Sequence, residues 1–288
     1  MAMTGADAYR ALLDAPLAAG AYPGDVVVEQ PYARYGTAEQ ETWRTLWRRQ
    51  SALMPGRACA AFVEGLRRLD LGERIPRFEA LSRTLRARTG FEIVAVNGLC
   101  SGPVFFEHLA SRRFPVTWWI RSPEQLDYLE EPDLFHDTFG HVPLLADPVF
   151  ADYMQAYGEG ALKALRLGGE TALAQLARLY WYTVEFGLVR EAGGLRLYGA
   201  GIVSSRGETL YSLESDTPKR LGFDLLRIMR TQYRIDDFQR CYFVIDDFAQ
   251  LFEATRPDFT PIYQRLRALP EIEPDAIVAG DRLIGTRA

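Results

Sequence analysis

Two long stretches of helical periodicity, at about residues 147–166 and 169–189, constrain the fold of this chain more than any other feature. Apolar side chains recur through both at the spacing of an amphipathic helix. Further helices are expected from Thr37 to the stop at Pro55 and at about 57–70 and 76–88. Thr37 is the expected N-cap of the first of these. We therefore predict a mainly α fold.

Strands are expected to be few and short. β-Branched and aromatic residues cluster at 91–96 and 114–120, with a short helix near 103–111 between them, and a hairpin at 192–194 leads into 195–203. No repeat, low-complexity block or flexible linker divides the chain. Residues 1–35 lack sustained periodicity and are expected to form a loosely ordered N-terminal arm. Residues 36–288 are predicted to form one domain.

Composition and charge exclude several classes of partner. The 288 residues carry 33 Lys and Arg against 38 Asp and Glu, so a net charge of -5 gives no electrostatic attraction to nucleic acid. The longest run without these charged residues is the 14 residues 93–106, whereas a membrane span needs about 20 apolar residues. Asp7 and Arg10 bracket no basic-then-apolar stretch of the secretory type, and the three cysteines are scattered. We expect a cytoplasmic protein with no membrane partner.

Two of the three histidines, His136 and His141, lie within residues 132–143. Imidazole is the commonest nitrogen ligand of transition metals, and ligands close in sequence need little ordering to converge. Five α-helical steps turn the chain by about 500 degrees, so the two side chains do not share one helix face. We therefore expect His141 to leave the helix, with Gly140 and Pro143 providing the exit. Two hydrogen-bonded histidines near a helix end are the alternative.

Glu185 is the only formal charge in the aromatic run 179–189. An unpaired carboxylate buried there would cost several kcal/mol, so an Arg or Lys partner, a proton or a metal must compensate it. Together with the two histidines it would make a 2-His-1-carboxylate set, which leaves half of an octahedron open and suits non-haem Fe(II) chemistry with O₂. A structural ion pair and a zinc hydrolase site are the other interpretations.

Three further residues have both a functional and a structural interpretation. Phe105 follows the glycine-containing loop 98–103 and could stack on a planar ligand, or it could be a buried residue at a helix start. Arg121 could bind a substrate carboxylate or form a structural salt bridge. His108 is interpreted as a surface or packing residue. Nucleotide-binding glycine motifs and the hydrolase nucleophile elbow are absent from the sequence.

Residues 131–144, 180–188 and 198–205 closely resemble, in order and spacing, the pterin-dependent aromatic amino acid hydroxylases. The resemblance covers roughly residues 90–255 and is closest to the bacterial phenylalanine 4-hydroxylases, which consist of the catalytic domain alone. It implies a catalytic domain over residues 36–288 and a monomer. It also implies conversion of L-phenylalanine to L-tyrosine with O₂ and tetrahydrobiopterin at Fe(II).

The resemblance also assigns roles to individual residues. The iron ligands would be His136, His141 and Glu185. The tetrahydrobiopterin site would comprise Gly98, Leu99, Ser101 and Phe105, with Phe105 stacked on the pterin. The substrate site would comprise Arg121 and Ser204 for the carboxylate, and Pro132 and Trp181 for the ring.

Trp181 and Ile235 favour phenylalanine, because tryptophan hydroxylases tend to carry Phe and tyrosine hydroxylases Asp at the corresponding positions. Leu129 and Gly102 depart from the Thr and Ser usual in the animal enzymes. The same site acting on tryptophan, or at the meta position of phenylalanine, is the alternative within the family. From other classes, a non-catalytic binding or sensor protein and a zinc hydrolase stay open.

Asp133 and Asp137 flank the first histidine. Carboxylates near a metal-binding imidazole often accept its second N–H. Either aspartate is therefore a candidate to orient an imidazole.

Overall fold

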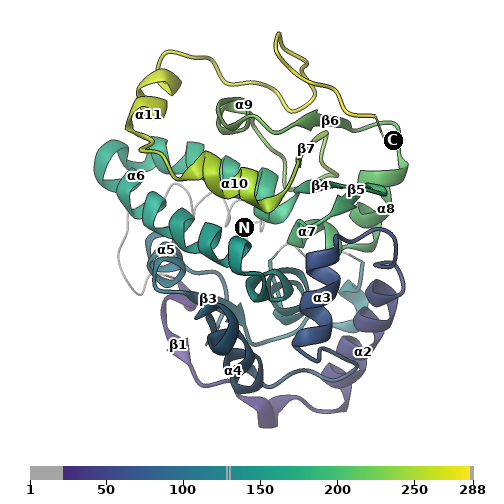
Figure 1. The fold of residues 1–288 in the computed structure, drawn as a ribbon. Coiled ribbons are helices and arrows are strands. Elements are labelled where there is room, and N and C mark those ends of the chain that lie inside the picture. Colours follow the sequence, from purple (N-terminus) through teal and green to yellow (C-terminus); the bar gives the residue numbers. More distant parts are fainter. Residues whose placement is uncertain (1–21, 128, 130, 286–288) are drawn as a thin grey trace, which may run out of the picture.

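Helices dominate this computed structural model, which describes residues 22–127, 129 and 131–285, and the predicted mainly α fold with a few short strands is confirmed (Figure 1). The α-helices are α2 Thr37–Ser51, α3 Ala60–Arg68, α4 Phe78–Thr89, α5 Gly102–Ala110, α6 Pro148–Tyr180, α7 Ala200–Val203, α8 Arg206–Glu214, α9 Leu225–Arg230, α10 Phe248–Thr255 and α11 Thr260–Leu266. Short 3₁₀ turns are η1 Pro23–Asp25, η2 Tyr32–Arg34, η3 Pro123–Gln125 and η5 Val142–Ala146. Two π-helical turns are η4 His136–His141 and η6 Trp181–Glu185.

The strands form two small sheets. The first has the order β1-β2-β3, from Val27–Val28, Glu92–Val96 and Arg113–Thr117, with β1 antiparallel and β3 parallel to β2. The second has the order β5-β4-β7-β6, from Gly194–Leu197, Leu188–Glu191, Cys241–Ile245 and Lys219–Gly222. Its β4–β5 hairpin lies where predicted, but the extended segment predicted at 195–203 ends at Leu197 and helix α7 follows it.

Helix α6 crosses the molecule, with the first sheet, α4 and α5 on one side and the second sheet and α9 on the other (Figure 1). Asp147 caps its start by accepting the backbone N–H groups of Val149 and Phe150. The two long helices predicted at 147–166 and 169–189 meet at Gly169, whose φ of 59° breaks the helical geometry. The second of them ends at Tyr180 rather than near residue 189, because the π-helical turn η6 and strand β4 follow.

The predicted N-terminal arm is not loose over its described part. Strand β1 pairs with β2, the Gly24 N–H donates to the Leu99 carbonyl at 3.1 Å, and the Tyr32 hydroxyl donates to the Ile75 carbonyl at 3.0 Å. The boundary at residue 35 is therefore wrong for residues 22–35, which belong to the folded body. Residues 1–21 of the predicted arm lie outside the described residues.

The first helix begins one position away from the prediction. Gly36 is the N-cap and Thr37 the first helical residue, and the Glu39 carboxylate accepts the Gly36 N–H at 2.9 Å. An acidic side chain in the first turn satisfies a free N–H group and favours the helix dipole.

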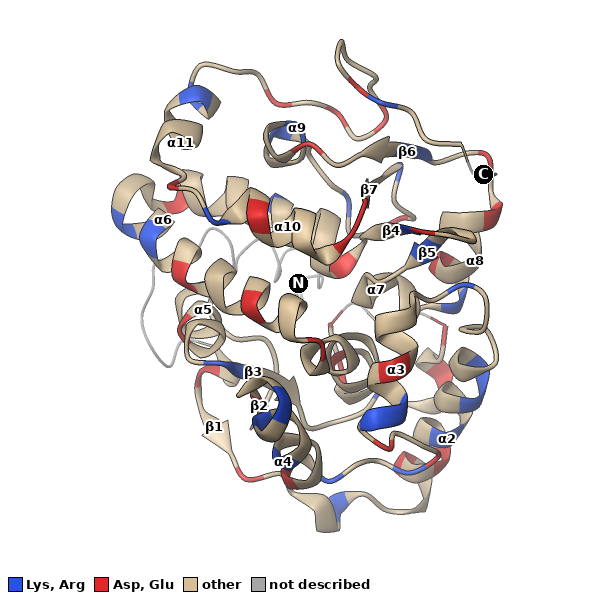
Figure 2. Ribbon diagram, viewed as in Figure 1, with Lys and Arg blue, Asp and Glu red and all other residues tan. Residues whose placement is uncertain are grey.

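Acidic and basic residues are interspersed along the helices (Figure 2). Among the described residues, no helix has the length and apolar character required to cross a bilayer. All three cysteines are buried free thiols.

Candidate metal centre and substrate pocket

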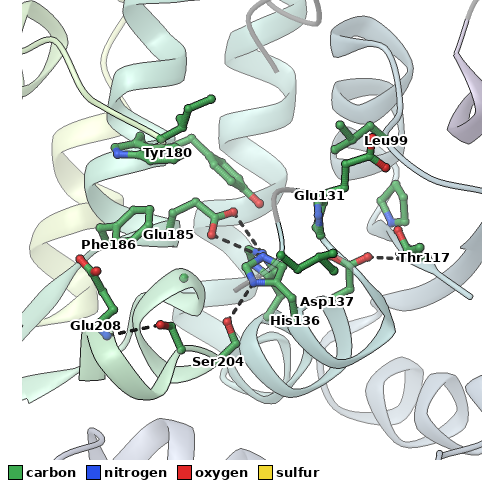
Figure 3. Close-up of a pocket in the computed structure, with 18 of the residues that line it drawn as sticks. Leu99, Thr117, Glu131, His136, Asp137, Tyr180, Glu185, Phe186, Ser204 and Glu208 are labelled. Atoms are coloured by element: carbon green, nitrogen blue, oxygen red, sulfur yellow. Dashed lines mark hydrogen bonds and ion pairs between the residues drawn. The ribbon is translucent and has the colours of Figure 1, made fainter. Parts of the chain in front are cut away.

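A cavity of about 770 Å³ opens beside the two π-helical turns. Its lining comes from the loop before α5, strand β3, η4, η6 and the segment around residues 235–239. Figure 3 shows the imidazole of His136 and the carboxylate of Glu185 pointing toward one another in this cavity. The cavity therefore brings together segments that lie far apart in the sequence.

The prediction that His141 leaves the helix is wrong, because both histidines lie in the π-helical turn η4. A π-helix has i→i+5 hydrogen bonds, so residues five apart lie close to the same face. The two Nε2 atoms are 3.1 Å apart. Gly140 does not provide an exit: a Cβ on it would lie 3.0 Å from the Ala200 carbonyl oxygen, so glycine permits close approach of α7.

Glu185 completes a cluster of three candidate ligands. Its carboxylate oxygens lie 3.1 Å from Nε2 of His141 and 3.6 Å from Nε2 of His136. A metal bound at about 2.1 Å with 90° between neighbouring ligands separates donor atoms by about 3.0 Å. Two imidazoles and one carboxylate at this spacing therefore fit a single metal ion, and all three residues line the cavity.

Burial and mutual charge set the protonation of this cluster. Burial lowers the pKa of His136 to about 4. Burial also opposes charge on His141, but the neighbouring Glu185 carboxylate raises its pKa overall. The pKa of Glu185 is lowered, since His141 and His136 outweigh the effect of burial. A neutral imidazole and an ionised carboxylate are the forms that bind a metal.

Ser204 determines which nitrogen of His136 faces the cluster. Its Oγ donates to the Ala200 carbonyl at 2.7 Å and lies 2.9 Å from Nδ1 of His136 (Figure 3). Because the hydroxyl proton is already used, Nδ1–H must donate to Oγ, which leaves Nε2 with a free lone pair. In this arrangement Ser204 orients a candidate ligand and has no proton left for a substrate carboxylate.

The hypothesis that Asp133 or Asp137 orients an imidazole is wrong: among the described residues, neither carboxylate accepts a hydrogen bond from a histidine ring. Asp133 accepts from the backbone N–H and from Nε and Nη2 of Arg121, at 2.8 to 2.9 Å, and from the backbone N–H of His136 at 3.0 Å. Asp137 accepts the Thr117 N–H at 2.7 Å. Ligand atoms of His136, Asp137 and His141 do lie within 4.8 Å of one another, and burial raises the Asp137 pKa to about 7. Glu185 makes the shorter contacts.

Arg121 is both a structural partner and a cavity residue. Its pair with Asp133 is buried, with side chains 8% and 0% exposed, and this pair lowers the pKa of Asp133. The hydrogen bonds to Asp133 use Nε and Nη2, so Nη1 lies outside the pair, and Arg121 lines the cavity. The structural interpretation of Arg121 is therefore correct and compatible with a role in binding.

The predicted pterin residues divide into two groups. Gly98, Leu99 and Phe105 line the cavity, whereas Ser101 does not. The Ser101 N–H and hydroxyl both donate to Oδ1 of Asp25, at 2.8 and 2.7 Å. Ser101 therefore anchors the loop to the N-terminal segment.

The predicted ring-binding residues, Pro132 and Trp181, both line the cavity. His108 is buried in α5, as expected for a packing residue, and burial lowers its pKa.

Comparison with known proteins agrees with this site. Residues 18–266 match the family model of the biopterin-dependent aromatic amino acid hydroxylases. The chain belongs to this family. A phenylalanine-4-hydroxylase of Ralstonia nicotianae is 62% identical over 91% of this chain and 84% of its own length. One of Chromobacterium violaceum is 59% identical over 90% of this chain and 89% of its own length.

Solved structures of C. violaceum phenylalanine hydroxylase have the same fold. A structure with bound Fe(III) has a TM-score of 0.88 and 56% identity, and covers 93% of this chain and 96% of its own. A structure with iron(III) and 7,8-dihydrobiopterin has a TM-score of 0.87 and 55% identity, with 91% and 94% covered. The resemblance to the hydroxylase family is thus confirmed, and a zinc hydrolase is not supported.

Sequence reasoning missed several residues that build this hydroxylase site. Asp25 anchors the loop before α5, and Glu208 and Gln239 line the cavity although they belong to none of the recognised motifs. Glu208 is a buried carboxyl whose pKa burial raises to about 7. No local pattern distinguishes these residues, because their partners are distant in the sequence.

Proposed function

We propose that this chain is a phenylalanine 4-monooxygenase that converts L-phenylalanine to L-tyrosine with O₂ and a reduced tetrahydropterin. The observation that carries the proposal is the convergence of His136, His141 and Glu185 within 3.1 to 3.6 Å beside a large cavity. Relatives 59% and 62% identical to this chain are named phenylalanine-4-hydroxylases. When bound, Fe(II) and the pterin supply the oxygen activation and the two electrons that side chains lack.

The three ligands would hold the iron from two π-helical turns. His136 contributes Nε2 because Ser204 accepts its Nδ1–H, and Glu185 supplies the negative charge that offsets part of the metal's charge. Three protein ligands would leave part of the metal's coordination sphere open for other ligands.

The loop from Gly98 to Phe105 forms the pterin site. Gly98 and Leu99 line the cavity beside Phe105, and the Phe105 ring packs edge-on against Phe114 and Tyr180, which holds it for stacking. Ser101 acts indirectly, through its two hydrogen bonds to Asp25.

The substrate lies between Arg121 and the aromatic wall. Nη1 of Arg121 binds the substrate carboxylate while Asp133 holds the guanidinium in place. Trp181 and Pro132 enclose the ring, and Ile235 adds an apolar surface. An apolar pocket excludes water and directs one ring carbon toward the metal.

Aerobic incubation of iron-loaded protein with phenylalanine and tetrahydrobiopterin tests the proposal. Chromatography should detect tyrosine and no meta-tyrosine. With tryptophan as substrate, hydroxytryptophan should form much more slowly than tyrosine forms from phenylalanine. Folded, iron-loaded protein that forms no tyrosine would reject the proposal. A meta product or faster tryptophan hydroxylation would establish the alternative within the family.

We also propose that the enzyme is a cytoplasmic monomer. Sedimentation equilibrium should give the 32.5 kDa of a single chain, and cell fractionation should place the activity in the cytoplasmic fraction. A mass of twice that value would show that the enzyme is not a monomer. Activity in another fraction would show that it is not cytoplasmic.

A further inference from the structure

The segment after α9 folds over Trp181, the aromatic wall of the substrate site. The ring of Tyr233 stacks on Trp181 with centroids 4.3 Å apart and an interplanar angle of 17°. Ile235, Phe238 and Gln239 of the same segment line the cavity. The wall that meets a substrate ring is therefore assembled from Trp181 and from a segment about 50 residues later.

Gln239 links the two parts of this wall. Its Oε1 accepts the indole N–H of Trp181 at 2.9 Å, and its Nε2 donates to the Arg234 carbonyl at 2.9 Å. The second bond closes residues 234–239 into a loop. Gln239 is only 4% exposed, so both bonds are made away from bulk solvent.

A buried carboxyl group holds Gln239 from behind. Oε1 of Glu208 accepts the Gln239 backbone N–H at 3.2 Å and also the hydroxyl of Tyr242. The Gln239 backbone is thereby hydrogen-bonded to α8, whereas its side chain is hydrogen-bonded to Trp181 and to the Arg234 carbonyl.

We propose that Gln239 is a positioning residue that sets the preference for phenylalanine over larger aromatic amino acids, an inference that rests on the proposed function. The indole N–H is the only hydrogen-bond donor of a tryptophan side chain, so a fixed acceptor defines the ring orientation. Removing the acceptor leaves a buried donor unpaired or lets the ring turn toward another acceptor. Either outcome alters the wall, and loss of the bond from Nε2 to the Arg234 carbonyl opens the loop beside it.

Gln239→Leu is the test, because it keeps the approximate volume and removes both hydrogen bonds. We expect the ratio of kcat/KM for phenylalanine to that for tryptophan to fall by about tenfold, the effect of one lost buried hydrogen bond. The change should appear mainly in KM for the amino acid, with iron content and KM for the pterin unchanged. A ratio within twofold of the wild type would overturn the proposal.

A matched control separates positioning from a general packing defect. Gln50 is also buried, at 2% exposed, and its Nε2 donates to the Val203 carbonyl, but it does not line the cavity. Gln50→Leu should lower the melting temperature and leave the substrate ratio unchanged. An equal fall in the ratio for both variants would show that Gln239 has only a structural role.

A double-mutant cycle with Trp181→Phe tests the route of the effect. The phenyl ring has no N–H, so adding Gln239→Leu to Trp181→Phe should change KM for phenylalanine by a clearly smaller factor than adding it to the wild type; only the bond to the Arg234 carbonyl remains to be lost. Independent, multiplicative effects would overturn the proposal. If Gln239→Leu does not fold, Gln239→Met removes the same two bonds with a more flexible side chain.

Calorimetric affinities distinguish this inference from the proposed function. Phenylalanine and tryptophan are titrated anaerobically into iron-loaded protein without pterin, so the affinity ratio does not depend on turnover. A shifted ratio in protein that makes no tyrosine would reject the proposed function alone. An unshifted ratio in an active enzyme would reject the role of Gln239 alone.

Discussion

Replacing Asp133 with Asn should destabilise the protein, because Asp133 is the buried partner of Arg121. The Asp133 side chain is fully buried and accepts four hydrogen bonds, three of them from Arg121. An amide keeps the shape but loses the charge, and it turns two N–H donors toward groups that are themselves donors. Breaking a buried ion pair in this way costs about 3–5 kcal/mol.

The expected shift in melting temperature follows from the size of the chain. An unfolding entropy of about 2.1 cal/mol/K per residue gives about 0.6 kcal/mol/K for 288 residues. A loss of about 3–5 kcal/mol therefore lowers Tm by about 5–8 °C. Because Arg121 also lines the substrate cavity, KM for phenylalanine should rise in the same variant.

Circular dichroism melts of Asp133→Asn and of a control variant measure this shift. The control is Glu73→Gln. Glu73 pairs with Arg48 at the surface, and the two side chains are 47% and 64% exposed, respectively. Exposed pairs are screened by solvent and contribute little to stability, so Tm should fall much less than in Asp133→Asn. If Asp133→Asn melts within 2 °C of the control, the buried pair does not support the fold as argued.

Three further predictions concern the cavity and the segments that support it. Asp25→Ala removes the acceptor of both hydrogen bonds from Ser101 and should raise KM for the pterin about tenfold. KM for phenylalanine should stay within twofold of the wild-type value. A parallel rise in both constants would contradict this prediction. Burial and the nearby Asp237 raise the pKa of Glu208 to about 7 in the folded protein. The folded state therefore holds this proton more tightly than the unfolded state does. As a result, the free energy of unfolding falls as pH rises from about 4.5 to 7. In denaturant titrations, the free energy of unfolding of Glu208→Gln relative to the wild type should rise by about 2 kcal/mol between pH 5.5 and pH 8. A difference between the two proteins that does not change with pH would refute the raised pKa of Glu208. Glu185→Gln removes the anionic ligand and should reduce iron content after gel filtration more than tenfold, whereas full occupancy would remove Glu185 from the ligand set.

Local patterns were sufficient to predict most of the elements and the identity of the candidate ligands. Helical patterns located α2, α3 and α4, and β-branched and aromatic clusters located β2 and β3. Glu185 was conspicuous because an isolated carboxylate is rare in an aromatic run, and the histidine pair because two of the three histidines lie within residues 132–143. These features depend on residues within one or two turns of each other, and the sequence displays them directly.

The tertiary structure decided how those residues meet. Neither π-helical turn could be read from periodicity, because a π-turn is a rare local geometry that needs support from packing, such as the contact of α7 with Gly140. Asp25 lies 76 residues from Ser101, and Gln239 lies 58 residues from Trp181. Hydrogen bonds across such separations leave no periodic trace in the sequence, so only the folded chain determines which polar groups hold the loop and the wall in place.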